Sequence, residues 1–478
     1  MNKAITIRLF FASLPVILFL LIQILPTFDD WTYLTAPDFG DPFAADRILP
    51  SNGYWRPFDA LIGSILGLNH HLFPTLNHFI ILLGHAIATY LVYRLAERSI
   101  LSALFFFLSP GMLGTVLDID SANQAYATCW GLASLLFYMQ GRKGLWMLCV
   151  VIATFCKENG IIYAVIPPLM HYFQQPSLHN VKKQTNNVKQ HLSNIKPYLR
   201  DMLPMMSLVA VYAAARILLT PADDAIKDDY LTPSLADHAK DLVQYIAGTW
   251  LPIDYEAIVF PPTRCIPLAL LTLLLAIPFL VVLARKFWNN RNNRMLYALI
   301  ALYFLAAAPH LLTLVSLMHV YAGLPFAALI INMLCKQLTR RQNIAVTLFL
   351  TAALITDIHH GYAAYQSGIV GKEMAEDVLK KSKTLPQSVY IINIDNGEKK
   401  YSTFNVIPRD AFGWGRAAGH YSDYTCAQSI EDTTITASGD NSTKQRILQD
   451  ITKKVEQKNT YDALWVVDGK NISILFER

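Results

Sequence analysis

The stretch ITIRLFFASLPVILFLLIQILPTFDDW, residues 5–31, decides the fold class. Its apolar part, from Ile5 to Pro26, is as long as the roughly 20 residues that a helix needs to cross the hydrocarbon core of a membrane. Lys3 and Arg8 stand at its start, and Leu25-Pro26-Thr27 lacks the small-residue pattern of a signal-peptide cleavage site. We therefore expect a retained membrane anchor with a cytoplasmic N-terminus.

The rest of the chain repeats this apolar character. Of its 478 residues 53% are hydrophobic and only 16% are charged, which excludes an ordinary soluble protein. The apolar runs predict about eleven spans of ~20 residues each and an α-helical, polytopic membrane domain over residues 1–360. The predicted spans are Ile5–Pro26, Thr75–Leu95, Ile100–Leu117, Ala122–Met139, Leu145–Phe155, Ile161–Phe173, Met202–Leu219, Cys265–Ala284, Met295–Leu314, Met318–Leu334 and Ile344–Ile358.

The basic residues give these spans an orientation. If the spans alternate sides, 18 of the 25 Lys and Arg residues before the tail fall on one side, as the positive-inside rule requires of the cytoplasmic side. Counting Leu145–Phe155 and Ile161–Phe173 as two short spans joined by a tight turn preserves this bias, and merging them abolishes it. The opposite side carries two acidic loops, 28–74 and 221–264, and we expect the functional site there.

Residues 361–478 predict a small α/β domain on the same outer side. This tail is nearly neutral, and its apolar residues alternate between the periods of helices and strands. The predicted helices are Gly371–Lys383 and Lys444–Gln457. The predicted strands are Ser388–Ile394 and Tyr401–Ile407, joined by a turn, and Asp462–Val467 and Ile472–Phe476, which form a closing hairpin.

Charge and cysteine content exclude several classes of function. A net charge of +5 does not indicate a nucleic-acid partner. The six cysteines include no CxxC pair and no metal-type spacing, so neither a disulfide framework nor a zinc module is indicated.

The first candidate site is the pair Asp29-Asp30, directly after the first span and followed by Trp31. Two adjacent carboxylates above the hydrocarbon boundary can supply a base and a partner that positions it, and Trp31 suits the interface or the face of a sugar. The alternative is a solvated acidic loop in which one of the two carboxylates caps a short helix.

Two further motifs place cations on the outer side. In Tyr54-Trp55-Arg56-Pro57 the Arg suits a phosphate group, unless it pairs with Asp59 or another carboxylate of the loop. Lys157 and Glu158 are adjacent and do not face each other on a helix, so each needs its own partner. A donor phosphate is a candidate for Lys157, and a salt bridge to Asp118 or Asp120 is the alternative.

Several other polar residues lie near predicted outer ends of spans. His78 and His85 share one face of a predicted span, where a hydrogen bond to a neighbouring helix is the simpler role and a metal site lacks enough ligands. The remaining candidates for the same interfacial cavity are Arg216, Arg264, His310 and His319, each of which is alternatively a snorkelling anchor.

These motifs together resemble the GT-C superfamily of polytopic glycosyltransferases. The resemblance is nearest to the protein O-mannosyltransferases, including those with tetratricopeptide repeats, and it covers roughly the first 175 residues. The motifs that carry it are Phe28-Asp29-Asp30, Tyr54-Trp55-Arg56-Pro57, Leu76-Asn77-His78 with His85, and Cys156-Lys157-Glu158-Asn159-Gly160-Ile161. The chain departs from the family in its α/β tail, which replaces the repeats, and in His319-Val320-Tyr321, where many relatives have a more basic motif.

The resemblance implies transfer of a sugar from a polyprenyl phosphate to an acceptor hydroxyl, with inversion, at the outer face of the membrane. It implies Asp29 as the catalytic base and Asp30 as its neighbour in catalysis or positioning. We assign Lys157, Arg56, Arg264 and His319 to the donor phosphate, and Glu158, Trp31, Tyr54, His78 and Arg216 to the sugar or acceptor. No cofactor is required, although the acidic loop could recruit a divalent metal, and the acceptor is a glycan, a lipid or a protein.

The main alternative is a polytopic transporter or flippase. It predicts charged or broken-helix features near the middle of the membrane in two related halves, whereas most charge here lies at the outer ends of the spans. A set of spans that only anchors the tail would not need eleven of them. The absence of a retention signal and of repeats favours a bacterial inner membrane with a periplasmic outer side.

Overall fold

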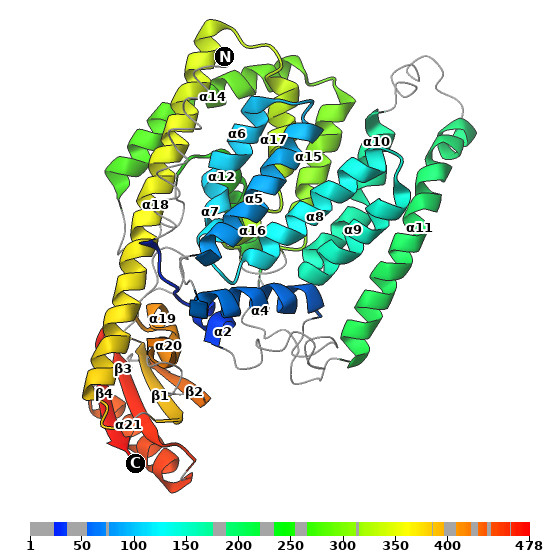
Figure 1. The fold of residues 1–478 in the computed structure, drawn as a ribbon. Coiled ribbons are helices and arrows are strands. Elements are labelled where there is room, and N and C mark those ends of the chain that lie inside the picture. Colours follow the sequence, from blue (N-terminus) through cyan, green and yellow to red (C-terminus); the bar gives the residue numbers. More distant parts are fainter. Residues whose placement is uncertain are drawn as a thin grey trace.

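The computed structural model describes residues 23–35, 55–72, 76–174, 188–219, 234–253, 265–311, 315–384, 386–395, 408–421, 429–436, 441–458 and 460–478. These residues form a bundle of helices and, at one end of it, a small α/β domain (Figure 1). A single long helix, α18 (Arg340–Lys381), runs from the bundle into the α/β domain.

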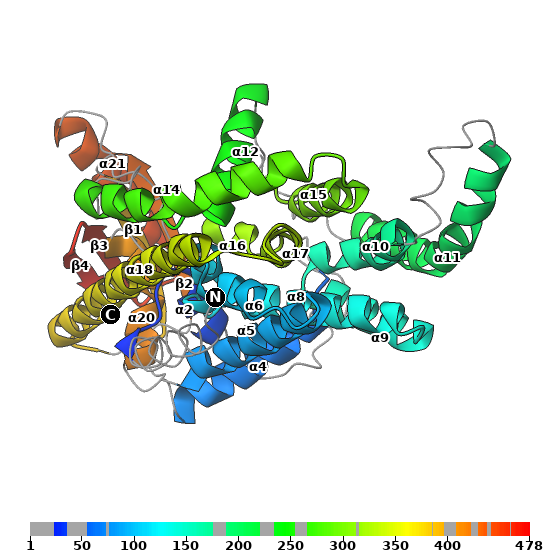
Figure 2. The ribbon, with the colours of Figure 1, turned by 90° about the horizontal axis from the view of Figure 1, so that it is seen from above.

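Most helices of the bundle overlap a predicted apolar run, whereas the helices at 29–35, 57–72 and 235–250 lie in the two predicted outer loops and were not predicted. The predicted spans Thr75–Leu95 and Ala122–Met139 are α5 (Leu76–Leu95) and α8 (Ala122–Met139). Its other helices are α2 (Asp29–Thr35), α4 (Pro57–Leu72), α9 (Lys143–Cys156), α10 (Ile166–Gln174), α11 (Val188–Leu219), α12 (Leu235–Trp250), α14 (Ile266–Asn289) and α15 (Arg294–Ala307). In the view along the bundle α18 lies beside α14, and α11 stands at the edge (Figure 2).

Within the described ranges, three helices are long and apolar enough to cross a membrane: α5, α14 and α18. Shorter apolar helices, α9 and α15 among them, accompany them. The first predicted span, Ile5–Pro26, lies almost entirely outside the described residues. The number of spans, about eleven, stays a prediction.

Two predicted spans are broken rather than continuous, which corrects the sequence interpretation. Ile100–Leu117 forms α6 (Ile100–Leu108), a 3₁₀ turn (Pro110–Met112) and α7 (Leu113–Val116). Met318–Leu334 forms α16 (Leu317–Val320) and α17 (Leu324–Leu334). Pro110 and Pro325 explain the breaks, because proline lacks the N–H that a continuing helix needs and is accommodated in a first turn.

The predicted pair of short segments before residue 175 is present as two separate pieces. Helix α9 ends at Cys156, Lys157 adopts an extended conformation, and a 3₁₀ helix, η3 (Glu158–Ala164), leads into α10. The turn is closed by the Gly160 N–H, which donates to the Lys157 carbonyl at 2.9 Å. A Cβ at Gly160 would collide with the backbone of Ala153, so glycine allows the chain to fold back onto α9.

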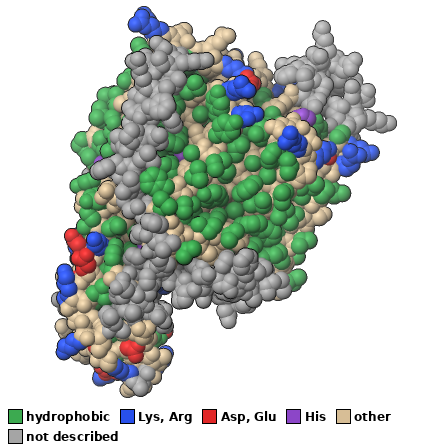
Figure 3. Space-filling model, in the orientation of Figure 1, with side chains coloured by type: hydrophobic (Ala, Val, Ile, Leu, Met, Phe, Trp, Pro, Cys, Tyr) green, Lys and Arg blue, Asp and Glu red, His purple; other side chains and the backbone are tan. Residues whose placement is uncertain are grey.

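The surface of the bundle separates apolar from basic side chains. Figure 3 shows a hydrophobic belt over the helices, with Lys and Arg gathered towards the end away from the α/β domain. At that end Lys336 pairs with Glu97 at 2.9 Å, and Lys286 donates to the Gln337 carbonyl at 2.9 Å. Both contacts lie close to Arg340, the first residue of α18. The acidic residues after the first span and the basic loops therefore occupy opposite ends of the bundle.

The α/β domain is a four-stranded sheet with helices on both faces. The strands are β1 (Ser388–Asp395), β2 (Ser429–Thr436), β3 (Ala463–Asp468) and β4 (Asn471–Glu477), in the order β2-β1-β3-β4. β1 is parallel to both of its neighbours, and β4 is antiparallel to β3. Side chains of one face pack on α18, and those of the other face pack on α21 (Asn441–Lys458).

The predictions for this domain are partly confirmed. β1, α21 and the β3–β4 hairpin match the predicted elements. The predicted strand Tyr401–Ile407 lies outside the described residues, and both edges of β1 are occupied by β2 and β3. β2 was not predicted, because SIEDTTIT contains only two aliphatic residues. The predicted helix Gly371–Lys383 is the end of α18, which crosses the predicted domain boundary at residue 360 without a break.

Candidate active site

Asp30 is a structural carboxylate. It is 3% exposed, and it accepts hydrogen bonds from three backbone N–H groups. Its Oδ1 accepts from Ile119 at 2.7 Å and from Asp120 at 3.1 Å, and its Oδ2 accepts from Thr27 at 3.2 Å. Since these bonds occupy both oxygens, Asp30 fixes the start of α2 to the loop between α7 and α8. Burial and the neighbouring Asp120 raise the pKa of Asp30, and the three backbone N–H groups oppose them.

Asp29 has a different environment although it is the adjacent residue. It is half-buried in the first turn of α2, where the N–H groups at the start of a helix favour a negative charge. Burial raises the pKa of Asp29 to about 7, and the nearby Asp120 and Asp410 carboxylates act in the same direction. The Arg416 guanidinium opposes them. A carboxylate with a pKa near neutrality is suited to general base catalysis at physiological pH.

Lys157 is a cation whose contact in the described part of the chain is a thioether and not a carboxylate. Its ammonium lies within 4 Å of no carboxylate in the described part of the chain, and its recorded contact is with Met318 Sδ at 3.9 Å. Burial and the neighbouring Arg56 lower the pKa of Lys157 from 10.5 to about 8, while Asp120, Glu158 and Asp59 attract its charge from further away. The expected alternative, a salt bridge to Asp118 or Asp120, is therefore not formed.

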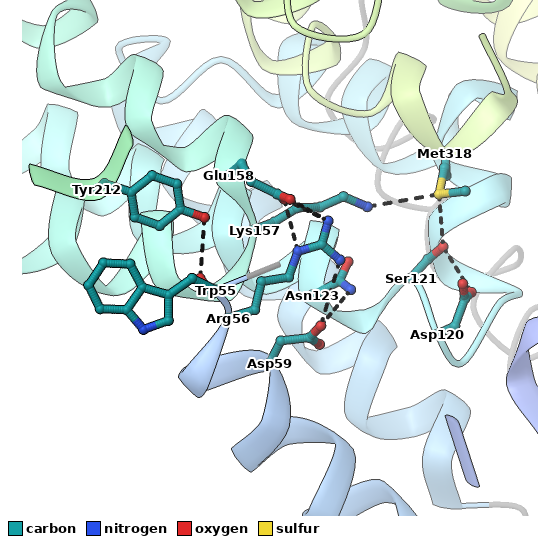
Figure 4. A network of polar contacts seen from close by, with 10 residues as sticks. All are labelled: Trp55, Arg56, Asp59, Asp120, Ser121, Asn123, Lys157, Glu158, Tyr212 and Met318. Atoms are coloured by element: carbon teal, nitrogen blue, oxygen red, sulfur yellow. Dashed lines mark hydrogen bonds and ion pairs between the residues drawn. The ribbon is translucent and has the colours of Figure 1, made fainter. Parts of the chain in front are cut away.

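Arg56 and Glu158 form the strongest ion pair of this region (Figure 4). Arg56 Nε and Nη2 each donate to one Glu158 oxygen at 2.9 Å, in the parallel arrangement that a guanidinium and a carboxylate favour. Arg56 Nη1 also lies 3.9 Å from Asp59. Glu158 is thus held by Arg56 through both of its oxygens, and its role at the sugar or acceptor stays a prediction.

Aromatic packing fixes the segment that carries Arg56. Trp55 stacks on Tyr212 of α11 with ring centroids 5.5 Å apart, and it meets Phe155 edge-on at 4.9 Å. The Tyr212 hydroxyl donates to the Trp55 carbonyl at 3.2 Å. These contacts place the start of α4 against the end of α9, so that Arg56 reaches the turn that follows Lys157 (Figure 4).

A polar chain links this turn to the loop after α15. Asn159 donates to Gln124 at 3.0 Å and lies 3.1 Å from His310 Nε2. The rings of His310 and His319 stack with centroids 4.6 Å apart. His319 Nδ1 accepts from the Ser316 N–H at 3.1 Å, which orients its ring at the first turn of α16. His319, predicted at the donor phosphate, therefore stacks on His310 and directly follows Met318, the residue that Lys157 contacts.

The other predicted site residues have mixed outcomes. Trp31 is fully buried, and its Nε1 donates to the Ala411 carbonyl at 3.2 Å, so the expectation that it faces a sugar is corrected. His78 is 1% exposed inside α5, which removes it from an open sugar site. Tyr54 and Arg264 lie outside the described residues, as does the side chain of Arg216 in α11.

The sequence interpretation named Asp120 only as a salt-bridge partner of Lys157, and it missed Arg416. Asp120 follows α7, and burial raises its pKa while Lys157 lowers it; Ser121 donates to its Oδ1 at 3.2 Å. Arg416 belongs to the α/β domain and acts on Asp29. The motif Asp118-Ile119-Asp120 between two apolar runs was a possible signal for Asp120, whereas no local pattern marks Arg416.

Within the described ranges, no group of three or more His, Cys, Asp or Glu side chains is arranged to hold a metal ion. The described site consists instead of a near-neutral carboxylate, Asp29, and a cation without an ionic partner, Lys157. Asp120 connects them electrostatically, because its charge acts on both. A general base together with a cation that share a charged neighbour suits the displacement of a phosphate by a hydroxyl group.

No protein-family model and no curated protein sequence matches the chain. Among solved structures, the chain is similar to ArnT from Cupriavidus metallidurans bound to undecaprenyl phosphate, with a TM-score of 0.50 and 9% sequence identity. The similarity covers 99% of this chain and 98% of ArnT. The apo form of the same protein gives a TM-score of 0.47 and 10% identity.

An identity of 9% establishes a similar fold and nothing finer. The expected resemblance to O-mannosyltransferases in particular is not confirmed by it. Over nearly its whole length, α/β domain included, the chain has a fold similar to that of ArnT.

Proposed function

We propose that the protein is a glycosyltransferase that moves a sugar from a polyprenyl phosphate to the hydroxyl group of an acceptor. The observation that carries the proposal is Lys157, a largely buried ammonium group whose recorded contact is a thioether. A buried charge without an ionic partner is unfavourable in a resting protein, and a bound phosphate would compensate it. The undecaprenyl phosphate bound to ArnT is a ligand of the corresponding chemistry in a protein of similar fold.

The proposed reaction is a single displacement. The acceptor oxygen attacks the anomeric carbon while Asp29 takes the proton of the acceptor hydroxyl, and the bond between the anomeric carbon and the phosphate oxygen breaks on the opposite side. The configuration at that carbon is inverted, and polyprenyl phosphate leaves. Lys157 stabilises the negative charge that grows on the departing phosphate, an effect that is larger in a partly dry site.

The other site residues support this pair. Asp30 holds the start of α2 in place through its three backbone hydrogen bonds. The bidentate pair of Arg56 and Glu158 fixes the turn on which Lys157 stands. His319, next to Met318 in the sequence and stacked on His310, is our candidate for a further phosphate contact.

The acceptor class, the sugar and the location are further parts of the proposal. We propose that the site faces the outer side of a bacterial inner membrane, because the basic loops gather at the opposite end of the bundle (Figure 3). A glycan, a lipid or a protein could supply the acceptor hydroxyl at that surface. No step requires a metal or an organic cofactor.

Mass spectrometry of the purified protein tests the proposal. We expect a polyprenyl-phosphate sugar to co-purify and to be depleted in Lys157→Met. Lys143→Met is the matched control, because Lys143 lies at the other end of α9, is exposed and already pairs with Asp201.

The same preparation separates transfer from transport. Incubation with acceptor material should release polyprenyl phosphate and form a new glycosidic bond, and Asp29→Asn should abolish this turnover while leaving the lipid bound. Asp377→Asn, at an exposed carboxylate of α18, is its control. Near-normal turnover of Asp29→Asn refutes the assigned base, and movement of the lipid across vesicles without bond formation favours a flippase.

A further inference from the structure

The α/β domain is attached directly to the helix that carries Asp29. The Phe28 N–H donates to the Asp410 carbonyl at 2.9 Å, and Trp31 Nε1 donates to the Ala411 carbonyl at 3.2 Å. The Trp31 ring also meets Tyr421 at 5.7 Å. Residues on both sides of Asp29 are therefore held by one segment of the domain, α19 (Pro408–Ala411) through α20 (Arg416–Tyr421).

The turn between these two helices has an unusual backbone. Gly413, Trp414 and Gly415 have φ values of 59°, 52° and 102°, and a tryptophan rarely adopts such a conformation. A Cβ at Gly413 would lie 2.6 Å from Trp31 Cδ1, so only glycine leaves room for the Trp31 side chain of α2 at this position. Backbone strain of this kind persists only where the surrounding contacts impose it, and it is concentrated at functional sites.

The turn directs two side chains towards α2. The Trp414 ring packs on Phe28, the residue before Asp29, with centroids 5.0 Å apart. Arg416 follows, with its Nη1 donating to the Gly413 carbonyl at 3.4 Å and its guanidinium 5.7 Å from the Trp414 ring. Its charge is thus held at the surface of α2, where it attracts the Asp29 carboxylate.

We propose that Arg416 is a positioning residue of the transfer reaction and that the α/β domain supplies through it the counter-ion of Asp29. The inference rests on the proposed function, in which Asp29 is the base. The remaining charges around Asp29 are mostly negative, so Arg416 is the cation that offsets them. The charged and titratable groups on the elements packed against α2 are Asp120 of the loop before α8, His70 of α4, Arg409 and Asp410 of α19 and Tyr421 of α20, in addition to Asp30 itself. Arg409 pairs with Asp410 at 3.5 Å and with Asp395 at 3.9 Å.

The consequence is a pH dependence that a purely structural role would not produce. Without Arg416, burial and the neighbouring carboxylates act on Asp29 unopposed, and its pKa rises above about 7. An opposite charge close to a carboxylate lowers its pKa by about one to three units, so its removal should move the titration of Asp29 upward by an amount in this range.

Labelling with dicyclohexylcarbodiimide measures this titration in the full-length protein in detergent, without substrate. The reagent modifies protonated carboxyl groups in apolar surroundings, and peptide mass spectrometry reports the modification at Asp29 as a function of pH. In the native protein we expect labelling to decline through about pH 7, and in Arg416→Gln the midpoint should lie at least one pH unit higher. Arg416→Lys, which keeps the charge, should restore the native midpoint.

The controls make each outcome decisive. Arg446→Gln removes an exposed arginine of α21 and should leave the midpoint unchanged. Arg416→Met, which keeps an apolar stem beside Trp414, replaces Arg416→Gln if that variant does not fold. An unchanged midpoint in the variants without charge, or an equal displacement in Arg416→Lys, overturns the inference. Because labelling needs no turnover, failure of the proposed glycosyl transfer would be seen separately, as an inactive native enzyme or an active Asp29→Asn.

Discussion

Replacement of Lys157 by methionine should stabilise the resting protein and at the same time remove its response to a phosphate lipid. The ammonium of Lys157 lies largely buried beside a thioether, where a methionine side chain of similar length would pack without a charge. Function and stability therefore make opposite demands on this position.

The size of the effect follows from the pKa of Lys157. A decrease from 10.5 to about 8 means that the folded protein disfavours the charged form by about 3 kcal/mol. Some remaining exposure to water reduces this, so we expect Lys157→Met to gain about 2 kcal/mol at pH 7. Because the pKa is lower in the folded than in the unfolded protein, the native chain carries the full penalty below pH 8. The penalty fades between pH 8 and 10.5, as the folded protein loses this proton first.

Thermal unfolding followed by tryptophan fluorescence, with and without undecaprenyl phosphate, measures both effects. A ligand at a hundredfold excess over its Kd stabilises a protein by about 2.7 kcal/mol, which should raise the Tm of the native protein by a few degrees. Lys157→Met should have the higher Tm without lipid at pH 7, a smaller advantage near pH 10 and no response to the lipid. Lys143→Met should behave like the native protein.

Two results would refute this reasoning. If Lys157→Met unfolds at a lower temperature than the native protein at every pH, Lys157 has a stabilising partner and is not an open anion site. If the variant still gains the same stability from undecaprenyl phosphate, the lipid phosphate binds elsewhere.

The kcat/KM for transfer should decline about tenfold per pH unit below about pH 6, because Asp29, with a pKa of about 7, is then protonated and cannot accept a proton. A pH–rate profile measures this decline, and a kcat/KM that stays constant in acid contradicts the prediction. Arg56→Gln and Glu158→Gln should each cost about 2 kcal/mol, since either removes one partner of a largely buried bidentate ion pair. The double variant should cost less than the sum of the two in a double-mutant cycle of thermal unfolding. Gly371→Leu should separate α18 from α19, because even a Cβ there collides with the Ala411 carbonyl. Protease cleavage after the bundle should increase, and the rate of transfer should fall at least tenfold. Gly144→Leu, at an open position, should change neither.

The helices of the bundle could be predicted because the signal is local. An apolar run of the right length reports a helix wherever it packs, and for Ala122–Met139 the predicted and observed limits are the same. The breaks at Pro110 and Pro325 also have a local cause, the proline itself, but a prediction based on the mean hydropathy of each run does not show them. The sheet was found in part, because β3 and β4 form a hairpin of neighbouring residues.

The roles within the site could not be predicted from sequence, because they depend on distant contacts. Asp29 and Asp30 are identical residues in the sequence, and the structure distinguishes them by burial and by the backbone N–H groups, among them those of the distant Ile119 and Asp120, that donate to Asp30. The contact between Trp31 and Ala411 joins residues 380 positions apart. No hydrophobic period or sequence motif indicates a contact between such distant residues. The sequence therefore predicts the α/β domain but not its packing on α2.

Because α18 is unbroken, its number of residues fixes the rotation of the α/β domain relative to the helix bundle. Its 42 residues extend for about 63 Å, roughly twice the hydrocarbon thickness of a membrane. Since each residue turns a helix by about 100°, the loss or gain of one residue within it would rotate the sheet and everything attached to it away from α2. The length of α18 between bilayer and sheet is therefore as much a requirement of the chemistry as any side chain, and tolerated insertions should be confined to loops elsewhere.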